Sequence, residues 1–257
     1  MKINFTKYHG TGNDFIMIDD RSETFDESNV KLIEAMCRRR FGIGADGLIL
    51  LRNEAEYDFK MVYFNSDGRQ SSMCGNGGRC LVQFAHSLGV FEHECKFLAI
   101  DGDHLGKVLT DGKIKLKMGN VGAIARDGED YILDTGSPHY IQSVDNVSQK
   151  DIQRDGALIR YSEHYKKDGI NVNFIEFVDG VLHVGTYERG VEDETYSCGT
   201  GVTASAIVAH EVHGCDSPVS INTKGGALKV HFEKSENGYN DIWLEGPAVK
   251  VFDGEWS

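Results

Sequence analysis

Apolar and polar residues alternate in short runs along most of this chain. Such runs predict strands that turn one face toward a core and the other toward solvent. They occur at residues 3–8, 15–18, 48–51, 59–64, 106–109, 113–117, 171–177, 181–184, 227–232 and 241–244. Asp-Gly pairs at 111–112 and 179–180 lie between such runs and predict hairpin turns. The pattern therefore predicts a fold rich in largely antiparallel sheet.

Three segments show helical spacing instead. Residues 28–40 are amphipathic, with their apolar side chains on one side. Residues 79–88 and 202–212 each follow a glycine-rich turn and stop before a glycine, Gly89 and Gly214 respectively. Positions 202–212 are apolar on nearly every face, which is typical of a buried helix. We therefore expect each half of the chain to wrap its sheet around one central helix.

The two halves also resemble each other. A shift of 124 residues places the CGNG sequence at 74–77 on the CGTG sequence at 198–201. The same shift aligns the Thr-Gly pair at 11–12 with that at 135–136. Few other positions are identical, so chance similarity among glycine-rich turns is the alternative to a duplication. One constant offset that serves both motifs favours a duplicated domain.

These observations predict an α+β fold of two pseudo-symmetric lobes, each a mostly antiparallel β-sheet rolled around a central helix. A chain of 257 residues is long enough for one large domain or for two of about 125 residues. We expect an N-terminal lobe at residues 1–118 and a C-terminal lobe at 119–247. A last strand at about 248–257 is expected to return to the first lobe.

The charge balance excludes several classes of partner. The chain has 27 Lys and Arg against 40 Asp and Glu, a formal net charge of −13. Nucleic acids and anionic membranes attract basic surfaces, so neither is an expected partner. The longest aliphatic run, residues 48–51, is far shorter than the ~20 residues of a membrane span. The N-terminal residues lack the apolar segment of a secretory signal, so we expect a cytoplasmic protein.

Six cysteines carry the candidate chemistry. Disulfides are not expected in a reducing compartment, and the absence of a Cys-x-x-Cys pair gives no support to a metal site. Cys74 and Cys198 each open a predicted helix at a Cys-Gly-x-Gly motif. There the unpaired backbone N–H groups and the helix dipole favour a thiolate and bind anions. One such motif also fits an ordinary turn.

Two such motifs related by duplication suggest stereoinversion. One thiolate can remove a proton from a carbon atom while a thiol on the opposite face returns another. Helix N–H groups can stabilise the enediolate that forms beside a carboxylate. No metal or pyridoxal is required, and no motif for either is present, so we expect no cofactor.

Five blocks of sequence resemble the signature blocks of the diaminopimelate epimerase family. They are KYHGTGNDF at 7–15, FNSDG at 64–68, MCGNGGRC at 73–80, YERG at 187–190 and SCGTG at 197–201. The resemblance extends from about residue 5 to residue 254. It implies interconversion of LL- and meso-2,6-diaminopimelate in lysine biosynthesis, without a cofactor, by a homodimer of two-lobed chains.

The resemblance also implies residue roles. Cys74 and Cys198 would be the acid–base pair, and His139 with Glu188 would modulate the pKa of the thiols. The substrate would be held by Asn13, Asn65, Gly75, Asn76, Asn171, Glu188, Arg189, Gly199 and Thr200. The backbone of the two motifs would bind the reacting carboxylate, and Glu188 with Arg189 the distal amino-acid end.

Three positions depart from the family pattern, and three other functions stay open. Ser137 stands where asparagine is common before Pro-His, Gly47 where many members have glutamine, and Phe252 where some have a dimer-contact tyrosine. The alternatives are a proline or hydroxyproline racemase, a redox-sensing thiol protein and a non-catalytic amino-acid-binding protein. A ring substrate would leave Glu188 and Arg189 without a distal zwitterion, and a binding protein would not need both thiols.

Overall fold

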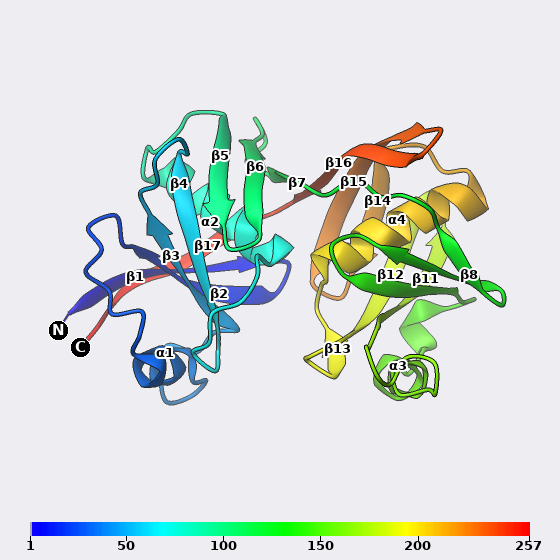
Figure 1. Ribbon diagram of the computed structural model, residues 1–257, viewed down its shortest axis with the longest axis horizontal. Helices are drawn as coiled ribbons and strands as arrows, with labels where there is room; N and C mark the ends of the chain where they lie inside the picture. Colours follow the sequence, from blue (N-terminus) through cyan, green and yellow to red (C-terminus); the bar gives the residue numbers. More distant parts are fainter. Residues whose placement is uncertain (1) are drawn as a thin grey trace. The chain divides into compact units, whose positions relative to one another are not determined.

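Each half of the chain folds into a sheet wrapped around one buried helix (Figure 1). The computed structural model describes residues 2–257. One unit comprises the chain up to Leu116 together with Gly246–Ser257, and the other comprises Lys117–Glu245. Within its own unit, α4 is enclosed by strands, whereas α3 lies outside them (Figure 1).

The first unit has one continuous order of paired strands, β17-β1-β2-β3-β4-β5-β6-β7. The β2–β3 and β4–β5 pairs are parallel and the others antiparallel. Its elements are β1 (Ile3–Gly10), β2 (Asn13–Asp19), α1 (Val30–Cys37), β3 (Gly47–Arg52), β4 (Phe59–Asn65), α2 (Gly75–Ser87), β5 (Glu94–Ala99), β6 (Gly102–Val108), β7 (Ile114–Lys117) and β17 (Val249–Trp256).

The second unit repeats this plan, with strand order β8-β9-β10-β11-β12-β14-β15-β16 and parallel pairs β10–β11 and β12–β14. The short β13 also pairs with β12. Its elements are β8 (Ala125–Asp127), β9 (Asp130–Asp134), β10 (Pro138–Ser143), η1 (Val147–Gln149), α3 (Ile152–Arg160), β11 (Asn171–Val178), β12 (Val181–Glu188), β13 (Asp193–Thr195), α4 (Gly199–His213), β14 (Val219–Thr223), β15 (Gly226–Ser235) and β16 (Gly238–Gly246).

The shift of 124 residues aligns the two units element by element. It places the start of β3, Gly47, on the start of β11, Asn171, and the start of α2, Gly75, on the start of α4, Gly199. The parallel pairs also correspond, β2–β3 with β10–β11 and β4–β5 with β12–β14. The predicted fold, two repeated lobes of mostly antiparallel sheet around a central helix, is confirmed.

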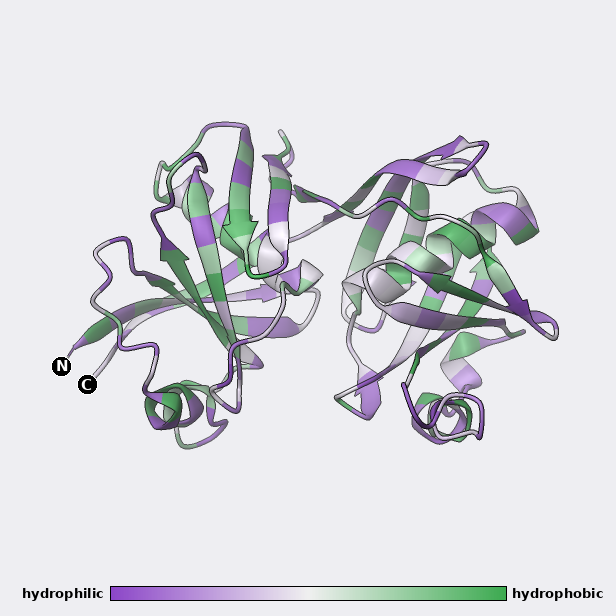
Figure 2. Cartoon of the chain, in the orientation of Figure 1, coloured by the Kyte–Doolittle hydropathy of each residue, from purple (hydrophilic) through white to green (hydrophobic). Residues whose placement is uncertain are grey.

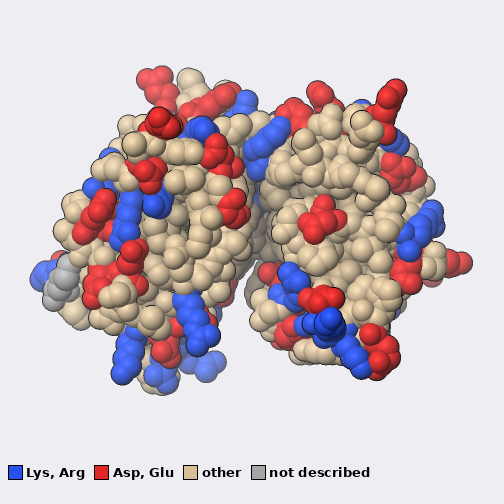
Figure 3. Space-filling model, in the orientation of Figure 1, with Lys and Arg blue, Asp and Glu red and all other residues tan. Residues whose placement is uncertain are grey.

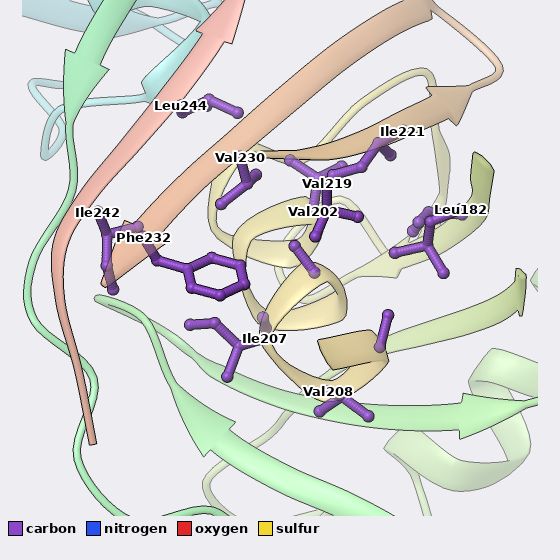
Figure 4. Packing of buried hydrophobic residues seen from close by; sticks show 14 of the residues in the cluster. Leu182, Val202, Ile207, Val208, Val219, Ile221, Val230, Phe232, Ile242 and Leu244 are labelled. Carbon is purple, nitrogen blue, oxygen red and sulfur yellow. The ribbon is translucent and has the colours of Figure 1, made fainter. Parts of the chain in front are cut away.

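The two central helices are the centres of the two main hydrophobic cores. Hydrophobic and hydrophilic positions alternate along several strands (Figure 2), and the buried apolar residues of the strands form one cluster with α2 and another with α4. Figure 4 shows the core around α4, where side chains from four strands converge on the helix. The labelled side chains are Leu182, Val202, Ile207, Val208, Val219, Ile221, Val230, Phe232, Ile242 and Leu244. Smaller clusters lie beneath α1 and α3.

Both central helices begin about one turn earlier than the sequence predicted. The motif glycines form the first turns of the helices. Gly77 and Gly201 lie so close to the sheet that a side chain there would not fit. A Cβ atom on Gly77 would lie 3.0 Å from Cδ1 of Ile49, and one on Gly201 would lie 2.5 Å from Oδ1 of Asn173. The predicted ends are confirmed, since Gly89 and Gly214 follow the helices with positive φ.

Acidic and basic side chains are interspersed over the visible face of both units (Figure 3). None of the helices within residues 2–257 combines the length and apolar character that crossing a membrane requires.

Candidate active site

Cys74 and Cys198 occupy the same position in the two units, immediately before α2 and α4. Both have extended backbone angles, and neither side chain caps its helix. The carbonyl oxygen of Cys74 accepts the first helical hydrogen bond from Gly78 N at 2.7 Å, and that of Cys198 accepts from Val202 N at 2.9 Å. The first-turn N–H groups have no intrahelical acceptor, so each sulfur lies at the positive end of a helix dipole.

Asn13 connects Cys74 to a carboxylate. Its Oδ1 accepts from Cys74 Sγ at 3.5 Å and from Nδ2 of Asn76 at 3.3 Å. Its Nδ2 donates to Oδ2 of Asp46 at 2.6 Å. Because the carboxylate can only accept, this bond fixes which end of the Asn13 amide faces Cys74. The structure thus brings together three predicted site residues of the first unit.

A cluster of ion pairs holds Asp46 in place. Arg39 Nη2 lies 2.7 Å from Oδ1 of Asp46 and 2.6 Å from Oδ1 of Asp14, and Lys7 Nζ lies 2.8 Å from Oδ2 of Asp14. Burial raises the pKa of Asp14, but the hydrogen bonds from Arg39 and Lys7 outweigh burial and bring that pKa down to about 2. Asp14 is therefore ionised at neutral pH, and the two acids are matched by two bases.

Cys198 lies at the end of a different chain of polar groups. Its Sγ lies 3.4 Å from Oγ1 of Thr200, which in turn lies 2.9 Å from Nε2 of His139. Nδ1 of His139 lies 3.0 Å from Nδ2 of Asn173. Asn173 completes the chain by accepting from Thr186 Oγ1 at 2.9 Å.

The direction of these hydrogen bonds follows from one carbonyl. Asn173 Nδ2 also lies 3.2 Å from the carbonyl oxygen of Tyr140, which can only accept, so this end of the amide is the donor. His139 Nδ1 is then an acceptor, and in the neutral ring the proton is on Nε2. This proton is donated to Thr200, whose own hydroxyl proton is left to point at Cys198 Sγ. The chain therefore directs a neutral donor at the sulfur.

His139 is neutral at physiological pH. Its side chain is wholly buried, and burial, with a smaller contribution from the charge of Arg189, lowers its pKa to about 3. The close packing of Gly201 accounts for the burial, because a Cβ atom there would lie 3.4 Å from Cε1 of His139. His139 therefore orients Thr200 without supplying charge.

Asn171 holds the segment that carries Arg189. Its Nδ2 donates to Oγ of Ser137 at 2.8 Å and to the carbonyl oxygen of Pro138 at 3.0 Å, and its Oδ1 accepts from the backbone N of Arg189 at 2.9 Å. Both amide protons are used within the protein, which leaves one lone pair of Oδ1 for a ligand. Nη2 of Arg189 lies 3.5 Å from the same Ser137 Oγ. Ser137 is therefore part of this network.

The other predicted site residues lie at the ends of equivalent strands. Asn65 ends β4 and is exposed, and Glu188 ends β12 immediately before the exposed Arg189. The shift of 124 residues places Asn65 on Arg189. Gly75 begins α2 and Gly199 begins α4, next to the two cysteines.

The remaining cysteines differ from this pair. Burial raises the pKa of Cys37, Cys80 and Cys95 to about 12, and burial also raises that of Cys215. These four therefore stay neutral thiols. Sequence reasoning missed Asp46 and Asn173, which support Asn13 and His139. A signal for Asn173 was available, because it is a polar residue between Val172 and Phe174 within the predicted strand at 171–177.

A family model and individual known proteins match this sequence under the same description. The sequence model of the family described as Diaminopimelate epimerase matches residues 5–124 and 131–251. A diaminopimelate epimerase of Flavobacterium psychrophilum is 50% identical over 249 residues, which are 96% of this chain and 97% of that protein. One from Chlorobaculum tepidum is 41% identical over 95% of this chain and 98% of its own length.

Solved structures share the fold at low sequence identity. A Bacillus anthracis phenazine biosynthesis protein of the PhzF family has a TM-score of 0.78 at 16% identity, over 100% of this chain and 99% of that one. A hydroxyproline epimerase from Agrobacterium vitis has a TM-score of 0.65 at 12% identity, over 99% of this chain and 92% of its own. At these identities the likeness concerns the fold.

Proposed function

This chain belongs to the diaminopimelate epimerase family, and we propose that it interconverts LL- and meso-2,6-diaminopimelate with Cys74 and Cys198 as acid and base. The observation that carries the proposal is the repeated placement of a thiol at the N-terminus of each central helix. Inversion at carbon needs a base on one face and an acid on the other. A duplicated fold with one thiol in each copy supplies two such groups.

The helix N-termini stabilise the carbanion in this proposal. Removal of the α-proton turns the reacting carboxylate into an enediolate, whose negative oxygens need donors. The first-turn N–H groups of Gly75, Asn76, Gly199 and Thr200 are such donors, and they point along the helix axis before any substrate binds. Neutral His139 assists by holding the Thr200 hydroxyl toward Cys198.

Substrate selection is assigned to the strand ends. Arg189 offers a planar fork to the distal carboxylate, and Glu188 an acceptor to the distal ammonium. The exposed Asn65 and the remaining lone pair of Asn171 Oδ1 add polar contacts, and Asn13 binds beside Cys74. A proline or hydroxyproline ring has no distal zwitterion for these groups, which favours diaminopimelate over the racemase alternative.

The chemistry proposed here needs no cofactor, because thiols and backbone donors perform each step. We place the reaction in lysine biosynthesis in the cytoplasm and propose that the protein works as a homodimer. Exposed apolar side chains on β17 support an interface there, including Val251 at 53% and Phe252 at 45% exposure.

The test is a substrate panel with the purified protein. Incubation with LL-diaminopimelate, in buffer free of pyridoxal phosphate and with a chelator present, should give meso-diaminopimelate by chiral chromatography. L-proline and trans-4-hydroxy-L-proline should stay unchanged. Inversion of a cyclic substrate in preference to diaminopimelate would reject the assignment, and loss of activity on chelation would reject the cofactor-free scheme.

A further inference from the structure

Arg79 is a buried cation next to the Cys74 motif. It lies in the second turn of α2 and is 0% exposed. Within residues 2–257, no Asp or Glu forms an ion pair with it, and the ionisable groups whose charge acts on it are Cys80 and Cys74. An arginine stays protonated, and an uncompensated buried charge is strongly destabilising. A negatively charged group near the Arg79 guanidinium would therefore stabilise the folded protein.

The hydrogen bonds of Arg79 direct its guanidinium at the start of the helix. Nη2 donates to Oδ1 of Asn76 at 2.9 Å and to Oγ1 of Thr11 at 3.2 Å, and Nη1 lies 3.4 Å from the carbonyl oxygen of Gly75. Nε is buried and has no hydrogen-bond acceptor. These contacts are all to neutral groups, so they orient the charge without cancelling it.

Of the two thiols whose charge acts on Arg79, only one can become the partner at neutral pH. Burial raises the pKa of Cys80 to about 12, so Cys80 stays neutral. Cys74 is partly exposed and precedes the first helical residue, where the helix dipole adds to the attraction for an anion.

The second unit provides a comparison within the same chain. The shift of 124 residues places Arg79 on Thr203, which is also 0% exposed and whose Oγ1 donates to the carbonyl oxygen of Gly199 at 2.9 Å. Cys198 Sγ lies 3.4 Å from the Thr200 hydroxyl, which lies 2.9 Å from the neutral imidazole of His139. The start of α4 therefore has the dipole, and the position equivalent to Arg79 holds a neutral hydroxyl.

We propose that Arg79 is a positioning residue that acts as the buried counter-ion of the Cys74 thiolate, so that Cys74 rather than Cys198 is ionised in the substrate-free protein. In that state Cys74 removes the first proton from a substrate on its side, and Cys198 supplies the second. The inference rests on the proposed function only where it assigns both cysteines to proton transfer.

Other groups around Cys74 do not remove this asymmetry. Asp14 and Asp46 are negative, but Lys7 and Arg39 match them. The hydrogen bond from Cys74 Sγ to Asn13 Oδ1 favours the neutral Cys74 thiol, and the Thr200 hydroxyl beside Cys198 Sγ favours a Cys198 thiolate, so both neutral contacts oppose the effect of Arg79. The charge of Arg79 acts on Cys74, and a full charge shifts a pKa by about 1–3 units, more than a neutral hydrogen bond does.

Thiol alkylation against pH tests the inference without a substrate. The thiolate is the reactive form, so the rate of labelling with iodoacetamide follows ionisation. Peptide mass spectrometry would measure the midpoints of Cys74 and Cys198 separately between pH 5 and 10. We expect Cys74 to titrate at least about one pH unit below Cys198 in the unaltered protein.

Variants at position 79 would then show whether Arg79 causes the lower midpoint of Cys74. Arg79→Met should raise the Cys74 midpoint by about one unit or more and leave that of Cys198 in place, whereas Arg79→Lys should keep most of the wild-type value. Thr203→Val is the matched control at the equivalent position and should move neither midpoint. Near-UV circular dichroism checks the fold of each variant.

Three outcomes would overturn the inference. They are a Cys198 midpoint at or below that of Cys74 in the unaltered protein, a folded Arg79→Met variant with an unmoved Cys74, and equal shifts of both thiols. If Arg79→Met does not fold, the wild-type order and the Arg79→Lys midpoint decide. Because no amino acid is present, failure of the proposed epimerase activity would leave these readings unchanged.

Discussion

The first turns of α2 and α4 have the same motif in the same fold, yet their polar support comes from different places. Beneath Gly77 the sheet presents the apolar side chains of Phe15 and Ile49. Beneath Gly201 the equivalent positions are His139 and Asn173. The first unit adds a cation, Arg79, on the helix itself to the contact from Asn13, and the second unit builds a neutral chain from the sheet.

This difference shows what the duplication kept and what it changed. The thiol and the backbone donors are the same in both copies, and the proposed mechanism needs both of them on each face of a planar carbanion. The surroundings differ in charge, which suits a pair that must be one base and one acid at the start of a turnover. Two identical surroundings would give both sulfurs the same pKa and leave the starting state undefined.

Removal of either sulfur should have the largest effect. Cys74→Ala and Cys198→Ala should each lower kcat for epimerisation of diaminopimelate by about 1,000-fold or more, and the double variant should be hardly worse, because the two groups work as a unit. Steady-state assays of the three variants would measure this. Cys95→Ala, at a buried thiol outside the site, serves as control. Near-native turnover in either single variant would contradict the two-base mechanism.

Acid should destabilise the second unit before the first. The folded pKa of His139 is about 3 against an ordinary 6.5, because burial and the charge of Arg189 disfavour its protonation. The unfolded chain binds a proton in that window and the folded chain does not. The contribution of neutral His139 to the unfolding free energy is therefore complete above pH 6.5 and is lost as pH falls toward 3.

Chemical denaturation would measure this loss. Between pH 6.5 and 4.5 we expect His139 to account for about 2 kcal/mol of the decrease in unfolding free energy. A His139→Gln variant should lack that part of the decrease. Asp14 of the first unit, with a pKa of about 2, stays ionised throughout this range. Identical pH profiles for the variant and the unaltered protein would contradict a buried, neutral His139.

Distal recognition should depend on the second unit, where Arg189 stands in place of Asn65. A charge-assisted bidentate contact contributes roughly 1.5–3 kcal/mol, so Arg189→Met should lower kcat/KM for diaminopimelate at least about tenfold. Arg154→Met, at an exposed arginine of α3, is the control. An unchanged kcat/KM in the Arg189 variant would point to another substrate.

The smallest effect should come from the Thr200 hydroxyl. Thr200→Val keeps the backbone donor but removes the group between His139 and Cys198. Loss of one neutral hydrogen bond should raise the alkylation midpoint of Cys198 by about half to one pH unit. The midpoint of Cys74 should not move. A shift of both thiols, or of neither, would show that the chain of polar groups in the second unit does not act on its own sulfur.

The sequence predicted the features that depend on local rules. The Asp179-Gly180 pair joins β11 to β12 as expected, since both residues have the positive φ of a tight hairpin turn. Helix α3 was missed, because Gly156 in its middle looks like an interruption. In the structure a Cβ atom there would lie 2.4 Å from Cβ of Tyr187, so close packing on β12 requires the glycine.

The residues of the candidate active site also separate into those predictable from local sequence and those that depend on tertiary packing. The sequence identified the two cysteines and their glycines, because the groups that make up a helix N-terminus are consecutive in the chain. Asp46 reaches Asn13 from the bend before β3, and Asn173 reaches His139 from the neighbouring strand, so neither partnership follows from spacing along the chain. The total burial of Arg79 likewise depends on tertiary packing, although the residue itself lies within the motif.

The central claim is that two sulfurs, one from each repeat, act on a single carbon atom. Epimerisation of LL-diaminopimelate in D2O tests it directly, with isotope content followed by mass spectrometry from the first turnovers. A thiol that has exchanged with solvent delivers deuterium, so the meso product should contain one α-deuterium while the unreacted LL substrate stays unlabelled. Deuterium that enters the unreacted substrate as fast as the product would mean that one group both removes and returns the proton, and would contradict the account.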